Sequence, residues 1–372
     1  MSIEIREITT KGDIKKFIRF YTDLYRENKQ VAFPLHIDED KSLRKGNPAL
    51  KFCRVRYWMA WEDQKPVGRI AAIINTREQE KTNRKIGRFG LFDFVDDIQV
   101  SELLMKQACR WLKQEGVDTL HGPMGFTDMD RQGLLIEGHD RAGTMSTNYN
   151  FDYYEKHINA LKFSKSTDWI EFLIYPDADI LARIKSLSDR CKKIHKLKSV
   201  KYKSHKKLKE RADEFFSLIN NGYSDLYGYV SLNEEQRKYY TECYLSYVHL
   251  DMISIVVDEK DRMVAAGVAM PSLTDALQKA KGKLLPTGIY HLYRAMKKSD
   301  CVDLCLIAVD RDYQGKGVNS IIMYDITKGA MDLGITKAET NIELEDNTNI
   351  HQMWKFFNGE QHKRRRCYIK KI

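Results

Sequence analysis

A short glycine-containing segment in the C-terminal half of the chain has the residue types that bind phosphate groups. It reads VDRDYQGKGVNS, from Val309 to Ser320, and we expect a strand before it and a helix after it. At such a junction several backbone N–H groups point to one place, and the helix dipole favours negative charge there. Gly315 and Gly317 permit the close backbone approach of an anion, while Arg311 and Lys316 add positive charge.

This loop differs from the two commonest nucleotide-binding loops. It lacks the GxxxxGK[ST] pattern of the P-loop, and Ser320 occupies the third glycine position of GxGxxG. Glycine pairs before helices also occur in ordinary turns. The loop alone therefore leaves an anion site and a simple turn both open, and the elements around it must decide.

The N-terminal half predicts alternating strands and helices. Apolar runs on both sides of EDQKP predict a hairpin over 56–74, and GRFGLFDFV predicts a strand over 87–95. Apolar residues at helical spacing predict a helix over 100–116, with Ser101 as N-cap and Gly116 at its end. A short strand at TLHGPMG, a helix over 148–163 and a strand at STDWIEFLIY follow.

The C-terminal half repeats this order. We expect a hairpin over 252–270, a strand over 301–309, a helix over 317–334, a strand at TKAETNIEL, a helix at NTNIHQMWKFF and a terminal strand at RRRCYIKKI. Such repetition predicts two copies of one mixed α/β domain, 1–176 and 177–372, with the boundary near Pro176. Each copy should contain a βαβ unit with a parallel strand pair.

Composition narrows the class of protein. A length of 372 residues fits about two domains, and 42% hydrophobic content excludes a disordered chain. Seven scattered cysteines without a CxxC pair argue against a disulfide framework or a zinc site. The charged start MSIEIREITTKGDIKKF is unlike a signal peptide, and no stretch reaches the roughly 18 apolar residues of a membrane span. We expect a soluble, cytoplasmic protein.

Positive charge is concentrated in the middle of the chain. The net charge is +10, and 11 of the 22 residues from Arg190 to Arg211 are Lys or Arg. We interpret this segment as a surface helix and strand at the start of the second domain. A basic surface attracts nucleic acid, acidic carrier proteins, phospholipid headgroups or phosphorylated cofactors, and a merely solvated face is equally open.

The loop resembles the pyrophosphate loop of the GCN5-related N-acetyltransferase (GNAT) superfamily, Arg/Gln-x-x-Gly-x-Gly/Ala. Gln314, Gly317 and Asn319 occupy its defined positions, and Asn319 departs from the small residue at the last one. The EDN triplet from Glu345 to Asn347 is also similar to that superfamily. The resemblance implies two tandem domains of the acyl-CoA N-acyltransferase fold, each a mixed central sheet with helices on both faces.

Three separated segments resemble the YghO-like, bacterial ceramide synthase-like family. They are GPMGFTDMDRQGLLIEG (122–138), MSTNYNFDYYEKHINALKF (145–163) and LIAVDRDYQGKGVN (306–319). This resemblance spans nearly the whole chain. It implies transfer of an acyl group from a thioester to an amine, with a long-chain sphingoid-type base as acceptor.

The resemblance implies acetyl-CoA or acyl-CoA as donor and no metal. It assigns donor binding to strand residues Ile307 and Val309, to loop residues Gln314, Gly315, Lys316, Gly317, Val318 and Asn319, and to Asn347. The backbone N–H groups before the loop would pair with the pantetheine and polarise the thioester carbonyl.

The acceptor amine must lose a proton, so a carboxylate or histidine is expected as base. Candidates beside the strands are Asp303, Glu343, Glu345 and His291, and alternation places Glu343 and Glu345 on one strand face. In the superfamily a tyrosine after EDN protonates the leaving thiolate, but Trp354 stands roughly there in this chain. Tyr313, Tyr290 or Tyr368 would substitute, or the thiolate leaves unassisted.

The first repeat lacks the loop. FVDDIQVSELLM runs from strand to helix without glycine, and Asp96 and Asp97 put negative charge where a pyrophosphate would lie. We expect the first domain not to bind coenzyme A and to wall the acceptor pocket instead. The aromatic residues of 149–154 predict either part of a core or the lining of an acyl channel.

The expected partners are a small-molecule or lipid amine, an acyl carrier protein and an anionic membrane surface at the inner membrane face. Two other functions stay open, an aminoacyl-tRNA-dependent transferase and a non-catalytic acyl-CoA-binding module. Nucleic acid is disfavoured because 190–211 lacks a long heptad pattern and the loop suits a pyrophosphate-bearing donor.

Overall fold

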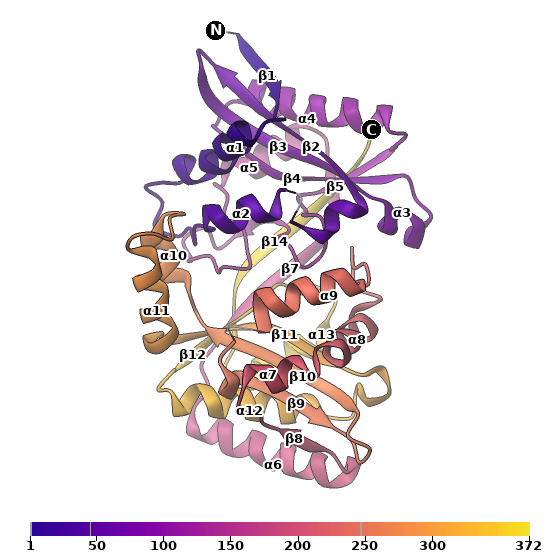
Figure 1. The fold of residues 1–372 in the computed structure, drawn as a ribbon, viewed down its shortest axis with the longest axis vertical. Helices are drawn as coiled ribbons and strands as arrows, with labels where there is room; N and C mark the ends of the chain where they lie inside the picture. The colour runs from indigo at the N-terminus through magenta and orange to yellow at the C-terminus, as the bar shows by residue number, and fades with distance from the viewer. Residues whose placement is uncertain (1, 45, 246–247) are drawn as a thin grey trace. The chain divides into compact units, whose positions relative to one another are not determined.

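The computed structural model describes residues 2–44, 46–245 and 248–372 (Figure 1). The chain forms two compact units. Unit 1 contains Met1–Ile170, Leu273–Arg294 and His362–Ile372, and unit 2 contains Glu171–Ser272 and Ala295–Gln361. This spatial division differs from the predicted sequence repeats 1–176 and 177–372, which stay a prediction about homologous units.

Unit 1 is built on a mixed sheet. Its strand order is β1 (Ile3–Glu7), β2 (Cys53–Glu62), β3 (Lys65–Asn75), β4 (Ile86–Phe94), β5 (Thr119–Gly122) and β14 (Glu360–Lys371), with β6 (Leu134–Glu137) also paired to β14. The pair β4–β5 is parallel, and the neighbouring pairs β3–β4 and β5–β14 are antiparallel.

Helices cover both faces of this sheet. They are α1 (Lys11–Leu24), α2 (His36–Ser42), α3 (Thr76–Thr82), α4 (Ile98–Gln114), α5 (Tyr153–Ala160), α10 (Thr274–Ala280) and the start of α11 (Gly288–Lys298). Successive strand residues point to opposite faces. Accordingly, Ile74 of β3 lies in the core cluster of Leu104 from α4, whereas Ile73 lies in that of Phe17 from α1.

The strands of unit 2 are ordered β12 (Lys337–Thr340), β11 (Cys301–Val309), β10 (Met263–Pro271), β9 (Ile253–Val257) and β8 (Lys198–Val200). The pair β11–β12 is parallel, and the end of β7 (Ser164–Ile174) adds antiparallel to β12. The helices are α6 (Ala178–His195), α7 (His205–Lys209), α8 (Ala212–Tyr223), α9 (Glu234–Tyr240), α12 (Asn319–Asp332) and α13 (Thr348–Phe356). Helices α6 and α12 pack together, and α8 packs on β10 and β11. The two-residue strand β13 (Glu343–Leu344) follows β12.

The expected element order and both parallel pairs are confirmed. Three local predictions are wrong. Asp97 rather than Ser101 caps α4, because the Asp97 carboxylate accepts from Gln99 N. Ser101 lies inside the helix, and its hydroxyl contacts His157 of α5. The helix predicted over 148–163 is shorter than expected, since only Tyr153–Ala160 are helical. The strand predicted at TKAETNIEL divides into β12 and β13, since Asn341 turns the chain by accepting from Ile342 N.

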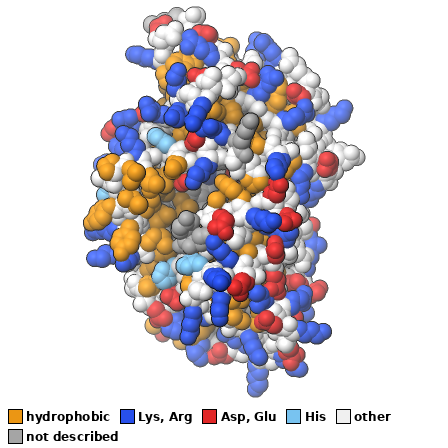
Figure 2. All heavy atoms as spheres, in the orientation of Figure 1, with side chains coloured by type: hydrophobic (Ala, Val, Ile, Leu, Met, Phe, Trp, Pro, Cys, Tyr) orange, Lys and Arg blue, Asp and Glu red, His pale blue; other side chains and the backbone are white. Residues whose placement is uncertain are grey.

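Two features of the molecular surface bear on function. The basic segment 190–211 forms the end of α6, β8 and α7, and nearly all of its residues are exposed or partly exposed, with Cys191, Leu197 and Leu208 buried. Hydrophobic side chains gather over α10 and α11, with Lys and Arg around them (Figure 2). Within the part of the chain that the structure describes, no helix has the length and apolarity needed to cross a membrane.

Candidate active site

The glycine loop joins β11 to α12 on the surface of unit 2. A short 3-10 turn, Arg311–Tyr313, follows β11, and α12 begins at Asn319. Gly315 and Gly317 have φ angles of +72° and +78°, and a Cβ atom at either position would meet no atom within 4 Å. Since only glycine adopts such angles without strain, these two residues make the turn, and it opens to solvent.

Several backbone donors at the start of α12 are unused. Among the described residues, the N–H groups of Gly315, Gly317, Val318 and Asn319 donate no hydrogen bond, whereas Ser320 N donates to Gly317 O at 3.0 Å. Val318 is the N-cap residue, and its side chain makes no capping hydrogen bond. Free N–H groups at a helix N-terminus, where the dipole is positive, are a site for an anion.

The side chains of the loop divide between holding it and adding charge. Gln314 Nε2 donates to Val309 O at 3.1 Å, which fixes the loop to the end of β11. Lys316 is exposed, and its Nζ lies 5.6 Å from the Tyr313 ring centroid. Arg311, expected as a second countercharge, pairs instead with Asp225. Lys316 is therefore the cation best placed for an anion at the loop.

The edge of β11 becomes free just before the loop. Its pairing with β12 ends at Leu304, whereas its pairing with β10 continues to Val309 across a bulge at Cys305. Asp310 N donates to Val264 O at 2.8 Å. Because antiparallel pairs alternate in their hydrogen bonding, Ile307 and Val309 then direct their N–H groups away from β10, toward the free edge.

Glu343 and Trp354 come together beside this edge. Trp354 Nε1 donates to Glu343 Oε2 at 2.7 Å, and Trp354 is buried. Burial raises the pKa of Glu343 to about 8, although the Trp354 hydrogen bond works in the opposite direction. Asn341 links this region to β11, because its N and Nδ2 donate to Leu304 O and Cys305 O at 3.2 and 3.3 Å. The Trp354 indole thus holds the Glu343 carboxyl in place.

The other predicted residues of unit 2 have different surroundings. Asp303 is buried in the paired part of β11, opposite Glu339 of β12. Glu345 and Asn347 are partly exposed in the turn before α13, and Asn347 O accepts from His351 N.

Three predicted residues belong to unit 1. His291 is partly exposed and Tyr290 is exposed, both on α11. Tyr368 is buried in β14, and its hydroxyl donates to Glu155 at 3.0 Å. Burial and the nearby Glu155 raise the pKa of Tyr368. This hydroxyl is therefore a poor proton donor where it lies.

Tyr223 is a site residue that the sequence did not single out. From the end of α8, its hydroxyl donates to Ile307 O at 2.9 Å, so it lies at the free edge of β11. Its ring packs edge-on against Tyr229 at 5.8 Å. Tyr223 has other tyrosines close by in the sequence, at 227 and 229, and no pattern distinguishes it from them.

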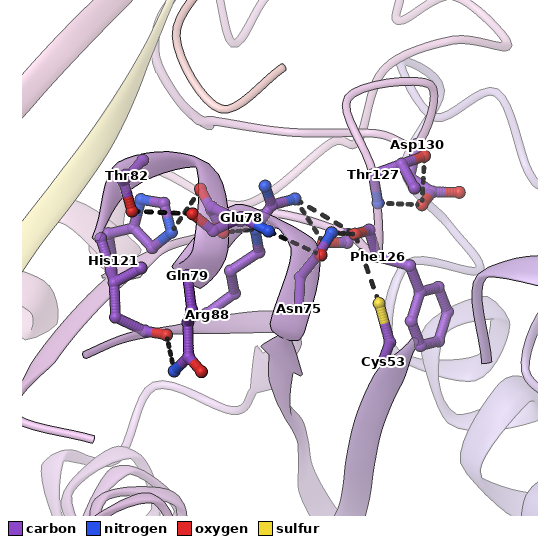
Figure 3. A network of polar contacts seen from close by, with 12 residues as sticks. Cys53, Asn75, Glu78, Gln79, Thr82, Arg88, His121, Phe126, Thr127 and Asp130 are labelled. Atoms are coloured by element: carbon purple, nitrogen blue, oxygen red, sulfur yellow. Dashed lines mark hydrogen bonds and ion pairs between the residues drawn. The ribbon is translucent and has the colours of Figure 1, made fainter. Parts of the chain in front are cut away.

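In the described part of unit 1, the strand of the parallel pair has no free edge like that of β11 in unit 2, because the chain itself lies against it. After the parallel pairing of Arg88 with His121, the following segment stays against β4, since Met124 N donates to Phe89 O at 2.8 Å. Arg88 holds this segment by donating to Gly125 O, and Asn75 Nδ2 donates to Phe126 O (Figure 3). Together with the Asp97 cap on α4, this is a local difference from unit 2, and the absence of a coenzyme A site in unit 1 stays a prediction.

The aromatic residues of 149–154 form core rather than a channel. Tyr154 is fully buried and shares a hydrogen bond of 2.7 Å with Tyr25, and Phe94 stacks on its ring. The cavity beside Tyr149 has a volume of about 30 Å³, room for about one water molecule. It is too small for an acyl chain.

Comparison with known families identifies the domain that carries the loop. The model of the acetyltransferase (GNAT) family matches residues 182–358. The chain carries a GNAT domain. The loop at 314–319 lies inside that match, so the resemblance to the superfamily is confirmed.

Two curated relatives cover nearly the whole chain. Protein YghO of Escherichia coli (strain K12) is 26% identical over 99% of this chain and 95% of its own. The bacterial ceramide synthase of Caulobacter vibrioides (strain NA1000 / CB15N) is 22% identical over 100% and 98%.

Solved structures confirm the tandem GNAT fold. A tandem GNAT protein from the clavulanic acid biosynthesis pathway has a TM-score of 0.59 at 11% identity, covering 100% of this chain and 98% of its own. A GCN5-related N-acetyltransferase from Sphaerobacter thermophilus has a TM-score of 0.55 at 8% identity, with 99% and 95% covered. The GNAT fold uses acetyl-CoA or acyl-CoA as donor, and the open amides of the loop fit its diphosphate. Among the described residues, no group of three or more His, Cys, Asp or Glu could hold a metal ion.

Proposed function

We propose that the chain is an N-acyltransferase whose unit 2 moves an acyl group from a coenzyme A thioester to an amine. The observation that carries this proposal is the solvent-open loop with unused N–H groups at Gly315, Gly317, Val318 and Asn319. A diphosphate offers the acceptor oxygens and the negative charge that these groups suit. Lys316 adds a cation beside them.

The free edge of β11 suits the rest of the donor. N–H groups of Ile307 and Val309 face outward from the sheet, as the alternation of the ladder requires. A pantetheine amide accepts from and donates to such an edge like an added strand. A thioester carbonyl next to an outward N–H would be polarised for attack.

Glu343 is the base that we assign to the acceptor amine. An ammonium has no lone pair, so one proton must leave nitrogen before it bonds to the thioester carbon. When a carboxyl with a pKa of about 8 is deprotonated, it is a stronger base than an ordinary carboxylate. Asn341, two residues before Glu343, donates to Cys305 O. Two residues of extended chain span roughly 7 Å, so Glu343 lies no farther than that from Asn341.

Tyr223 is the proton donor that we favour for the leaving thiolate. When the carbon–sulfur bond breaks, sulfur keeps the electron pair and needs a proton. The Tyr223 hydroxyl lies at Ile307 O, on the same edge. A thiol has a pKa near 8.5, so the thiolate can also leave without a proton donor. We therefore expect loss of the Tyr223 hydroxyl to lower the rate less than loss of the Glu343 carboxyl.

We propose a long-chain amine of the sphingoid type as acceptor. Support comes from the curated relative named bacterial ceramide synthase, which aligns over the full chain at 22% identity. An acyl carrier protein is the alternative donor, and the basic surface suits it equally well.

The test is to incubate the purified chain with acetyl-CoA and palmitoyl-CoA, with and without a long-chain amine. We expect free thiol to be released only with the amine, and mass spectrometry to detect the amide. Thioester binding without any amine-dependent turnover would instead indicate a binding module. Absence of thioester binding would contradict the loop assignment.

A further inference from the structure

Unit 1 exposes large apolar side chains on one short segment. Leu285, Ile289, Tyr290 and Tyr293 are 70, 53, 59 and 60% exposed. We call these four residues the α11 face. Isolated exposed apolar residues are normal on a protein surface, but a contiguous group is typical of a binding surface.

The spacing shows that α11 is an amphipathic helix. Ile289, Leu292, Tyr293 and Met296 follow the i, i+3, i+4, i+7 pattern of a helix that buries one side. Yet Gly288 is the one buried residue among those of α11 that the structure describes. Of these four residues, Ile289 and Tyr293 are exposed and Leu292 and Met296 are partly exposed, so none of them is fully buried.

The neighbouring helix α10 holds the segment in place. It buries Ala276, Leu277 and Ala280, and Gln278 Nε2 donates to Lys29 O. Gly282 O accepts from His36 N at 2.8 Å. One half of the helical hairpin is anchored in unit 1, and the other half presents the α11 face.

Charge on this segment has a single sign. From Ala276 to Ser299 the chain contains six Lys or Arg residues and no Asp or Glu. Lys281, Lys283 and Arg294 are exposed. Figure 2 shows the apolar patch over α10 and α11 with basic side chains at its margin. The partner must therefore combine an apolar interior with an anionic surface.

We propose that the α11 face docks on an anionic lipid bilayer. Apolar side chains enter the acyl boundary, tyrosines suit the headgroup level, and Lys and Arg contact anionic headgroups. An acidic protein would satisfy the charges, but four apolar side chains more than half exposed need an apolar phase. This proposal goes beyond the acyl transfer and concerns where the chain meets a lipid acceptor.

The test is sedimentation with vesicles of phosphatidylcholine, with and without phosphatidylglycerol. The full chain should bind the anionic vesicles and bind pure phosphatidylcholine weakly. Ile289→Glu/Tyr293→Glu should weaken binding by about tenfold or more, because charge replaces inserted apolar surface. Leu187→Glu is the matched control, since Leu187 on α6 is also 50% exposed, and it should bind as the parent does.

A second variant separates charge from insertion. Lys283→Gln/Arg294→Gln should reduce binding to anionic vesicles and its sensitivity to salt, with little change on phosphatidylcholine. Equal binding by all variants, or binding to an acidic carrier protein but to no vesicle, would overturn the proposal. Vesicle binding requires neither donor nor acceptor, so its failure is distinguishable from failure of the acyl transfer, which a water-soluble amine measures separately.

Discussion

At the residue scale, the site depends on one carboxyl group in an unusual setting. Glu343 is only partly exposed and accepts a hydrogen bond from a buried indole. Burial favours the neutral form of a carboxyl, and the donated hydrogen bond favours the charged form. Burial prevails here, since the pKa rises to about 8. A group of this kind is a base whose protonation changes near physiological pH.

Replacement of Glu343 tests this role. We expect the kcat/KM of the parent chain to rise as pH passes through about 8, where the carboxyl loses its proton. Glu343→Gln should lower kcat by roughly 10²–10⁴-fold and remove that rise. Glu345→Gln, in the turn that directly follows β13, is the control and should keep both rate and profile. A larger loss in the Glu345 variant would transfer the role to that residue.

Trp354 should tune the same profile. Its N–H hydrogen bond lowers the pKa of Glu343, so Trp354→Phe removes the stabilisation of the carboxylate. A hydrogen bond to a charged group contributes about 1.5–3 kcal/mol, so the rise in kcat/KM should move upward by about one to two pH units. The pH dependence of the rate checks this. A shift toward lower pH would show that the indole does not act on Glu343 in this way.

At the element scale, an ion pair fixes the end of the parallel pairing in unit 1. Arg88 Nε donates to Glu78 Oε2 at 2.7 Å, and His121 Nε2 lies 3.5 Å from Glu78 Oε1 (Figure 3). Burial alone would raise the pKa of Glu78, but Arg88 and His121 outweigh it and lower the pKa to about 2. The charged form of Glu78 therefore belongs to the folded state.

This pair predicts acid sensitivity of unit 1. Its stabilisation is present above the ordinary Glu pKa of 4.5 and is lost as pH falls toward about 2, an effect on the order of 3 kcal/mol. At neutral pH, Glu78→Gln should destabilise the chain by about 3–5 kcal/mol, because it leaves a buried Arg88 without its partner.

Thermal unfolding measured from neutral to acidic pH checks this prediction. Glu115→Gln is the control, since Glu115 pairs with Arg54, whose side chain is half exposed, and an exposed pair contributes at most about 1 kcal/mol. Equal losses for the two variants would show that burial does not set the strength of the Glu78 pair.

The sequence predicts individual helices and strands better than it predicts the contacts between them. The glycine loop, β11 and α12 are local in sequence, so glycine spacing and apolar periodicity were sufficient for them. Glu343 and Trp354 meet only because α13 packs back on β13, and no local pattern reports that contact. The N-cap of α4 was missed for a local reason, since both Asp97 and Ser101 are good caps.

At the scale of the whole molecule, the described residues contain one fold twice, but the glycine loop between β11 and α12 has no counterpart in unit 1. The helix after the parallel strand starts with a carboxylate cap in unit 1 and with free N–H groups in unit 2. Unit 1 carries the apolar, basic α11 face instead. From these two helix starts we predict that unit 2 and not unit 1 binds the donor.

One donor site per chain is the consequence, and calorimetric titration with coenzyme A measures it. We expect one molecule bound per chain, and Gly317→Glu should abolish binding because its side chain crowds and repels the diphosphate. Gly334→Glu is a closely matched control, since Gly334 has a φ of +76°, equally open surroundings and a place at the other end of α12. Both changes strain the backbone by about 1–2 kcal/mol, but only the first lies at the free N–H groups. Two molecules bound per chain, or binding that survives Gly317→Glu, would place a donor site in unit 1 as well.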